Sequence, residues 1–267
     1  MTIIIRGGGD LASGVALRLH RSGLNVLISE LPEPLVVRRK VSFAEAVHEG
    51  SWRVEDVEGV LIDRPEDRFR VWGAGQIPVL VDPKLHSLSG VQPEVLVDAR
   101  MRKRPPEKGK EQAPLVIGLG PGFQAGENCH AAVETNRGHH LGRVYWQGAP
   151  EADTGIPGEV AGYRAERVLR APVAGVLRNQ EEIGNLVEAG QLIADVSGKT
   201  VTAPFTGAIR GLLRNGTRVK EGMKIGDVDP RCDPSYSRVV SDKARSIGGG
   251  VLEAILSREE LRSELWT

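Results

Sequence analysis

The sequence predicts an α/β fold, in which a parallel sheet is followed by a small all-β domain and a C-terminal helix. Three observations predict this. A strand, turn, helix and strand open the chain over residues 2–30, short apolar runs that end in aspartate follow, and short strands repeat in the second half. We expect a nucleotide-binding domain over 1–160, a β domain over 161–230 and a terminal segment with a helix over 231–267.

The first thirty residues form one βαβ pattern. Residues 2–6 are a β-branched run, three glycines follow, and apolar residues then recur at helical spacing until Gly23. Gly7-x-Gly9-x-x-Ala12 matches the dinucleotide fingerprint, and Glu30 lies where the fingerprint places an acid for a ribose hydroxyl. We therefore predict a Rossmann-like sheet with a phosphate on the unpaired N–H groups of the helix start. The residues assigned to this site are Gly7, Gly8, Gly9, Asp10, Ala12, Ser13 and Glu30.

The same turn has a simpler interpretation. A carboxylate at Asp10 would repel a phosphate at the helix start unless a cation intervened. Aspartate is also a good helix cap, and the glycines would then only make a tight turn. The short motif is compatible with both interpretations.

Three short apolar runs end in aspartate, at Asp63, Asp82 and Asp98. Continuous apolar runs that alternate with helix-like stretches are typical of a parallel sheet covered on both faces, so these carboxylates should lie at one sheet edge. Proline follows Asp63 and Asp82 within two residues, which favours helix capping for both. Asp98 has no such neighbour, so we keep it as a candidate for the ligand site, with capping as the alternative.

A second glycine-rich turn follows the apolar run 115–119. Two glycine turns at one sheet edge indicate a shared ligand pocket, in which a nearby arginine can contact an anion. The candidates here are Gly118, Gly120, Gly122 and Arg137. The basic loop 102–114 is expected to be solvated rather than a partner site.

The second half contains an internal repeat, because residues 171–177 match residues 203–209, 32 positions later. Two such copies can interlock as a small β-barrel or a β-sandwich. The repeat resembles the biotinyl/lipoyl carrier domains, and this resemblance implies a small all-β barrel. Those carriers hold their cofactor on a lysine near the position of Lys199, but the Glu-Ala-Met-Lys type of motif is absent. We expect Lys199 at a hairpin tip, with no biotin or lipoate.

Two further segments connect and end the chain. Residues 147–165 are rich in Gly, Ala and Pro, include the stretch 154–158, and are expected to lead out of the first domain. The apolar positions of 251–265 suit one face of a packed helix. The triple glycine at 248–250 is expected to be a ligand turn or a hinge.

Composition limits the classes of function. Basic and acidic residues balance at 35 each and aromatic residues are only 4%, which argues against nucleic-acid and membrane-surface partners. Cys129 and Cys232 form no CxxC motif, and the neighbouring His139 and His140 lack matching ligands, so we expect no metal site. No signal peptide or apolar span is visible, and we expect a cytoplasmic protein.

Several stretches together resemble a known family. They are residues 6–14, 118–123, 134–139, 154–158, 229–230, 241–245 and 248–250. The resemblance is to accessory proteins of the selenium-dependent molybdenum hydroxylase system, the YqeB-type family, and it spans nearly the whole chain. It implies a cytoplasmic maturation factor for a molybdenum enzyme, with a molybdenum hydroxylase subunit as partner, and it carries over no catalytic residue.

Three functions follow from these patterns. The first is a maturation factor that binds a nucleotide, either a dinucleotide or a molybdopterin-type cofactor, at the glycine turns. The second is an NAD(P)-dependent oxidoreductase, for which no residue stands out as proton donor. The third is a non-catalytic scaffold that docks partners through the β domain. A second copy of the chain is a further candidate partner, and whether the chain is an enzyme is left open.

Overall fold

A computed structural model describes residues 1–153, 155 and 158–263 of the chain. The contacts divide the chain into two compact units. Unit 1 consists of Met1–Pro34, Ser42–Thr154 and Val240–Thr267, and unit 2 consists of Leu35–Val41 and Gly155–Val239. Thr154, Ile156 and Pro157, in the segment expected to lead out of the first domain, lie outside the described residues.

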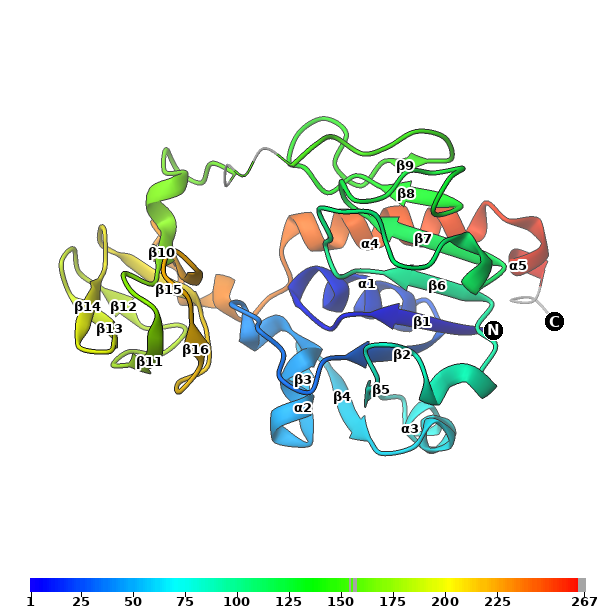
Figure 1. The fold of residues 1–267 in the computed structure, drawn as a ribbon, viewed down its shortest axis with the longest axis horizontal. Coiled ribbons are helices and arrows are strands. Elements are labelled where there is room, and N and C mark those ends of the chain that lie inside the picture. Colours follow the sequence, from blue (N-terminus) through cyan, green and yellow to red (C-terminus); the bar gives the residue numbers. More distant parts are fainter. Residues whose placement is uncertain (154, 156–157, 264–267) are drawn as a thin grey trace. The chain divides into compact units, whose positions relative to one another are not determined.

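Unit 1 is built on a nine-stranded sheet with the order β3-β4-β5-β2-β1-β6-β7-β8-β9 (Figure 1). The strands from β4 to β8 are parallel to their neighbours, whereas β3 and β9 pair antiparallel at the two edges. In chain order the strands are β1 Thr2–Arg6, β2 Asn25–Glu30, β3 Ser51–Val54, β4 Val57–Ile62, β5 Ile77–Val81, β6 Val95–Asp98, β7 Leu115–Leu119, β8 Ala131–Val133 and β9 Val144–Tyr145.

The prediction of a Rossmann-like parallel sheet is therefore wrong, because the sheet is mixed. At one edge, β3 and β4 form a hairpin closed by Glu55 and Asp56, and Glu55 has a positive φ of 55°. Hairpin turns of this kind usually carry Asn-Gly or Asp-Gly, so the sequence gives no turn signal here. At the other edge, β9 is only two residues long, and such a short strand leaves no periodic pattern to detect.

Two helices of unit 1 pack side by side, α1 Asp10–Arg21 and α4 Asp242–Leu256 (Figure 1). They approach closely at Gly14, because glycine has no side chain. A Cβ at this position would lie only 2.6 Å from the Ala244 Cβ. One turn further along both helices, a Cβ on Gly248 would lie 3.0 Å from the Arg18 Cβ, so the helices run in the same direction. Both helices therefore begin at the same end. The remaining helices of unit 1 are α2 Ala46–Glu49, α3 Arg68–Gly73 and α5 Glu259–Ser263.

The C-terminal helix differs from its prediction over residues 251–265. It begins at Asp242, where the Ser241 side chain accepts a hydrogen bond from the Ala244 amide, and it ends at Leu256. The triple glycine lies inside this helix, so it is neither a turn nor a hinge.

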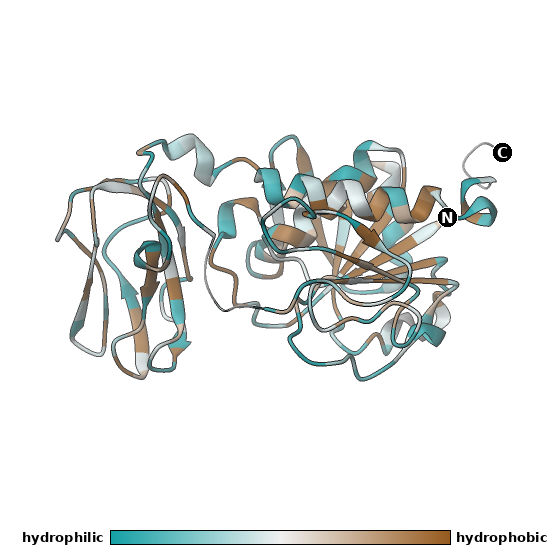
Figure 2. Cartoon of the chain, turned by 90° about the horizontal axis from the view of Figure 1, so that it is seen from above, coloured by the Kyte–Doolittle hydropathy of each residue, from teal (hydrophilic) through white to brown (hydrophobic). Residues whose placement is uncertain are grey.

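The core of unit 1 covers both faces of the central strands. Ile3, Ile4 and Ile5 are all buried, which matches a strand packed on both sides. Ile4 packs with Leu96 of β6 and with Val71 of α3 in one cluster. Figure 2 shows the central strands brown over most of their length, in keeping with apolar runs that are buried on both faces.

Unit 2 consists of two four-stranded antiparallel sheets, with the orders β10-β17-β15-β12 and β14-β13-β11-β16. The prediction of a closed biotinyl/lipoyl-like barrel is therefore wrong. The strands are β10 Val168–Arg170, β11 Gly175–Asn179, β12 Leu186–Val187, β13 Leu192–Val196, β14 Lys199–Thr202, β15 Gly207–Leu212, β16 Arg218–Val219 and β17 Lys224–Asp229.

The 32-residue repeat is visible in these strands. Strand β11 starts at Gly175 and β15 at Gly207, and the next strands of each copy follow at the same offset. The copies interlock, because β12 of the first copy pairs with β15 of the second, and β16 of the second pairs with β11 of the first. Lys199 adjoins the Ser197–Gly198 turn of the β13–β14 hairpin, as predicted.

Among the residues that the structure describes, no helix combines the length and apolar composition that crossing a membrane requires.

Candidate functional site

The first glycine turn lies where β1 ends and α1 begins, and most of its polar groups already have partners. The Gly8 amide donates a hydrogen bond to the Glu30 carboxylate at 2.6 Å, and the Gly7 amide donates to the Ser29 carbonyl at 2.7 Å. A second Glu30 oxygen accepts from the Leu31 amide. Glu30 is buried, and this burial raises its pKa although the two amide hydrogen bonds oppose the shift. Glu30 thus closes the turn instead of presenting its carboxylate for a ribose.

The segment before α2 covers the same turn. The Gly8 carbonyl accepts hydrogen bonds from the Ala44 amide and the Ser13 hydroxyl, which itself accepts from the Phe43 amide at 2.8 Å. A Cβ on Gly8 would lie 2.9 Å from the Ala44 nitrogen, so only glycine fits beneath this segment. Ala12 is buried as well. The half of the turn built by Gly8, Ala12 and Ser13 is therefore occupied by the protein itself.

The other half of the turn faces the start of α4. Gly9 is the N-cap residue of α1, with an extended backbone and no side chain that caps the helix. Asp10, the first residue of α1, acts electrostatically on Lys243 in the first turn of α4. Because α1 and α4 begin at the same end, their first-turn N–H groups and Lys243 lie together. Lys243 therefore places a cation near Asp10.

Arg137 and two carboxylates complete the cluster around Lys243. Arg137 forms a two-pronged ion pair with Asp242, with N–O distances of 2.7 and 2.8 Å. Glu134 is buried at the end of β8 and accepts hydrogen bonds from the Asn136 and Glu151 amides. Arg137, Asp242 and Glu134 all act electrostatically on Lys243.

The pKa of Lys243 is lowered, and the main cause is its burial, with the charge of Arg137 as a lesser cause. Asp10 and Glu134 act in the opposite direction. The cluster holds three carboxylates and two cations, and two helix N-termini add about half a positive charge each. The charges of this cluster therefore nearly cancel.

The second glycine turn is explained by packing. A Cβ on Gly118 would lie 2.0 Å from Phe123 Cγ, and a Cβ on Gly122 would lie 2.5 Å from the Arg102 carbonyl oxygen. Gly120 has a positive φ of 86°, and a Cβ there would lie 2.9 Å from the Thr135 hydroxyl. The absence of a side chain at these glycines leaves room for neighbouring atoms of the protein. These contacts explain the glycines without a ligand.

The aspartates at the strand ends have separate roles. Asp98 is buried and binds the Arg100 guanidinium at 2.9 and 2.5 Å, with Arg6 at 3.8 Å. The Asp82 carboxylate accepts from the His86 and Ser87 amides. The helical turn that follows begins at Ser87 and not at Pro83, so Asp82 does not cap a helix that starts with Pro83, as was predicted.

Two other groups of polar residues lie elsewhere in unit 1. Arg64, and not the predicted Asp63, is the N-cap residue of the next turn. His139 and His140 contact each other edge to face. Within the described part of the chain, no three His, Cys, Asp or Glu residues are grouped as a metal site would need.

Sequence reasoning assigned Asp10 and Arg137 to the site but missed Glu134, Asp242 and Lys243. These three lie in stretches 134–139 and 241–245, which the sequence analysis used only as evidence for the family resemblance. The signal that was available is their charge within those stretches. The convergence of Asp242 and Lys243 with Asp10 depends on the packing of α4 against α1, across more than two hundred residues of chain, and no local pattern encodes that contact.

Comparisons with solved structures give only weak likenesses. An aspartoacylase family protein from Mesorhizobium loti is 10% identical, with 85% of this chain and 84% of that chain covered and a TM-score of 0.28. The ectoine utilization protein EutE from Ruegeria pomeroyi is 10% identical, with 85% of each chain covered and a TM-score of 0.26. Scores this low carry no argument about fold or function.

No protein-family model matches the chain. Over 254 residues the chain is 46% identical to the "Uncharacterized protein YqeB" of Escherichia coli (strain K12), with 95% of this chain covered. The match covers 47% of that protein, so the chain spans about half the length of this relative. Over the matched residues, the chain is similar to this protein.

Proposed function

We propose that unit 1 binds the phosphate of a nucleotide, or of a nucleotide-bearing molybdenum cofactor, at the edge formed by Asp10 and Lys243. We further propose that this binding serves the maturation of a molybdenum hydroxylase. One observation carries the proposal. Three stretches far apart in the sequence, 6–14, 134–139 and 241–245, supply the residues that meet around Lys243.

The chemistry of this edge suits a phosphate. The N–H groups in the first turn of a helix lack partners within the helix, so an anion can accept their hydrogen bonds. Two helices begin together here, although the Ser241 side chain already accepts from the Ala244 amide of α4. Lys243 adds a cation and offsets the repulsion from Asp10. Arg137 is held by Asp242, which accepts from two of the five N–H donors of its guanidinium.

The oxidoreductase alternative is less well supported. A dinucleotide bound through the fingerprint would need the Glu30 carboxylate for a ribose and the Gly8 amide for a diphosphate, and these two groups bind each other. The proposed ligand therefore contacts the start of α1 from the side of α4, rather than from the side of β2.

The phosphate site is tested by isothermal titration calorimetry of the full chain with ADP, CMP and inorganic pyrophosphate. Lys243→Gln keeps helix propensity and removes the charge, so we expect affinity to fall at least tenfold, which is about 1.4 kcal/mol. Asp10→Asn removes the repulsive charge and should leave affinity equal or higher. Lys84→Gln, an exposed lysine of unit 1, is the matched control.

Two results would contradict the phosphate site. One is the absence of binding to all three probes by the wild-type chain. The other is equal affinity in wild type and Lys243→Gln. The maturation role needs a separate measurement, which is the molybdenum content of a hydroxylase co-expressed with either variant. Lys243→Gln should lower that content and Lys84→Gln should not.

A further inference from the structure

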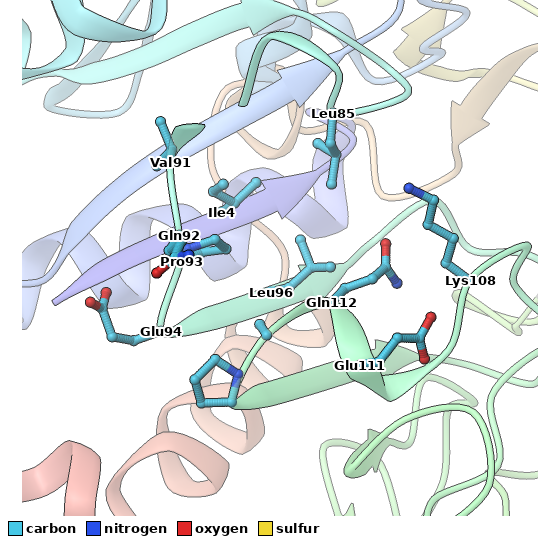
Figure 3. A pocket seen from close by; sticks show the side chains of 12 residues that line it. Ile4, Leu85, Val91, Gln92, Pro93, Glu94, Leu96, Lys108, Glu111 and Gln112 are labelled. Atoms are coloured by element: carbon cyan, nitrogen blue, oxygen red, sulfur yellow. The ribbon is translucent and has the colours of Figure 1, made fainter. Parts of the chain in front are cut away.

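Two cavities of unit 1 differ in the charge of the residues that line them. The larger, of about 640 Å³, lies over β1 and β6 and is bordered by one lysine and two glutamates, so both signs of charge are present (Figure 3). The smaller, of about 290 Å³, lies between α1 and the start of α4. Among the described residues, the charged side chains that line it are all arginines: Arg18, Arg21 and Arg245. The lining of this arginine cavity is therefore positive.

One stripe of α1 forms a wall of the arginine cavity. Its residues follow the spacing i, i+3, i+4, i+7 and i+8 of a single helix face, and they are Gly14, Leu17, Arg18, Arg21 and Ser22. Gly14 and Leu17 are buried, whereas the other three are exposed. The surface of this wall that a ligand can reach is therefore made of two guanidinium groups and one hydroxyl.

The third arginine comes from α4, where this helix packs closely on α1. A Cβ on Gly14 would lie 2.6 Å from the Ala244 Cβ, and a Cβ on Gly248 would lie 3.0 Å from the Arg18 Cβ. Arg245 directly follows Ala244 and lines the cavity beside this contact. Arg18 and Arg245 therefore approach the cavity from two helices whose backbones are held close together.

Arg21 is fixed at the cavity by carboxylates outside the lining. Its Nη2 atom donates to Glu55 at 2.7 Å and also to Asp56. The second Glu55 oxygen accepts from the Val240 amide at 2.8 Å, and Val240 lines the cavity. Both bonds of Arg21 use Nη2, so its Nη1 and Nε atoms keep hydrogens that can bind a ligand.

The charges of the other two arginines are not balanced. Neither guanidinium of Arg18 and Arg245 has a hydrogen bond or an ion pair with a residue that the structure describes. The positions three and four residues away from Arg18 along α1 contain no acid. Asp242, three residues before Arg245, is bound to Arg137 instead. An anion in the cavity would supply the missing negative charge.

Helix dipoles explain the position of two arginines but not of the third. Arg18 and Arg21 lie in the last turn of α1, where a cation stabilises the negative end of the helix dipole. Arg245 lies in the first turn of α4, at the positive end of that helix, where a cation is unfavourable. The stability of α4 therefore gives no reason for an arginine at this position, whereas an anionic ligand does.

We propose that the arginine cavity binds the phosphate group of a small phosphomonoester. Arg18 and Arg245 donate paired N–H groups to the phosphate oxygens, because the guanidinium fork matches a phosphate, and Arg21 adds its Nη1 and Nε donors. A volume of about 290 Å³ equals that of about ten water molecules at about 30 Å³ each, so the space holds a phosphate and a short carbon chain. The Ser22 hydroxyl donates to the Arg18 carbonyl at 2.9 Å, and its oxygen can accept from a hydroxyl of that chain.

This site is separate from the edge at Asp10 and Lys243. Each residue of an α-helix is rotated by about 100° from the one before it, so Lys243 and Arg245 lie on opposite sides of Ala244. Ala244 contacts Gly14 of α1 and divides the two sites. Lys243 interacts with Glu134 and Asp10, whereas Arg245 lines the cavity.

The test is calorimetric titration of the full chain with glycerol 3-phosphate, and with glycerol as the uncharged comparison. Glycerol 3-phosphate should bind and glycerol should not. Arg18→Gln and Arg245→Gln keep helix propensity and should each weaken the binding at least tenfold, because each removes a pair of charge-assisted hydrogen bonds. Arg70→Gln, at an exposed arginine of α3, is the matched control and should bind as wild type. No measurable binding of glycerol 3-phosphate by wild type, or wild-type affinity in both variants, would overturn the proposal.

A thermal scan and a crossed titration complete the test. Arg18 and Arg245 are exposed, so both glutamine variants should melt at the temperature of wild type, and a variant that does not is replaced by the other in the comparison. Lys243→Gln should leave the affinity for glycerol 3-phosphate unchanged, and Arg245→Gln should leave the affinity for ADP unchanged. Loss of glycerol 3-phosphate binding in Lys243→Gln would show that the phosphate binds at the Lys243 edge, and it would overturn the arginine cavity.

Discussion

The Gly8 amide donates its hydrogen to the Glu30 carboxylate at 2.6 Å, so two residues that the fingerprint assigns to a ligand bind each other. Glu30 is 7% exposed, and its second oxygen is held by the Leu31 amide. A buried carboxylate with two amide donors fixes the exit of β2 against the turn after β1. Glu30 and Gly8, which predict a nucleotide site in the sequence, therefore stabilise the fold instead.

Stability should depend on the ionisation of Glu30. Burial raises its pKa above the ordinary value of 4.5, so the folded state binds the proton more tightly than the unfolded state does. The stabilisation from the protonated Glu30 is fully present below the pKa that Glu30 has in the unfolded chain. It is lost as pH rises through the higher pKa that Glu30 has in the folded chain. A tenfold difference in proton affinity between the two states corresponds to about 1.4 kcal/mol. The free energy of unfolding of wild type relative to Glu30→Gln should therefore decrease as pH rises from 4.5 towards neutrality.

Urea denaturation of both proteins across this pH range measures the difference. Glu33→Gln, at an exposed glutamate of the following turn, should show no such trend relative to wild type. A difference between wild type and Glu30→Gln that stays constant or grows with pH would contradict the raised pKa.

Local signals in the sequence predicted the local elements of unit 1. The β-branched run, the glycines and the stop at Gly23 placed β1, α1 and β2 close to their observed bounds, and the parallel pairing of β1 with β2 followed. The edges of the sheet could not be predicted in this way. The β3–β4 hairpin turns through Glu55 and Asp56, which lack the glycine of the usual Asn-Gly and Asp-Gly turns, and its strands pair antiparallel at the edge of the sheet.

The candidate site was predicted only in part, for a reason of chain distance. Asp10 belongs to a local motif, so the sequence pointed to it. Lys243 meets Asp10 only because Gly14 and Gly248 let α4 pack closely on α1, and that packing is a tertiary contact with no local signature. The glycine spacing also misled, because Gly118 and Gly122 fit the protein's own Phe123 and Arg102.

Substitution at the N-cap of α1 separates helix stability from phosphate binding. Gly9 has φ −66° and ψ −179°, a conformation that any residue adopts, and aspartate is a favourable N-cap. Gly9→Asp should therefore leave the melting temperature equal or higher. Its carboxylate would occupy the proposed phosphate position, so affinity for pyrophosphate should fall at least tenfold below that of Gly9→Asn, which caps equally well without charge. Equal affinities of the two variants would count against the phosphate site.

The three consecutive glycines of α4 should respond differently to alanine. A Cβ on Gly249 meets nothing within 4 Å, whereas a Cβ on Gly250 would lie 2.1 Å from the Gly142 carbonyl oxygen. Gly249→Ala should stabilise the chain by about 0.5–1 kcal/mol, because alanine has the higher helix propensity. Gly250→Ala should destabilise it by about 1–3 kcal/mol, because the backbone at Gly142 must move. Chemical denaturation of both variants measures the two signs, and destabilisation by Gly249→Ala would show that the segment is not a regular helix.

The two cysteines should differ in reactivity towards iodoacetamide. Cys129 is buried in the core of unit 1, and this burial raises its pKa to about 11, so it holds very little thiolate at pH 8. Cys232 is exposed, and its thiol contacts the Pro230 and Thr206 carbonyls. Native protein should gain a single adduct, on Cys232, and protein in 6–8 M urea should gain two. Mass spectrometry of the intact chain and of its peptides gives both numbers. Rapid labelling of Cys129 in the native protein would mean that the loop from Phe123 to Cys129 opens readily, since no buried thiol reacts until solvent and reagent reach it.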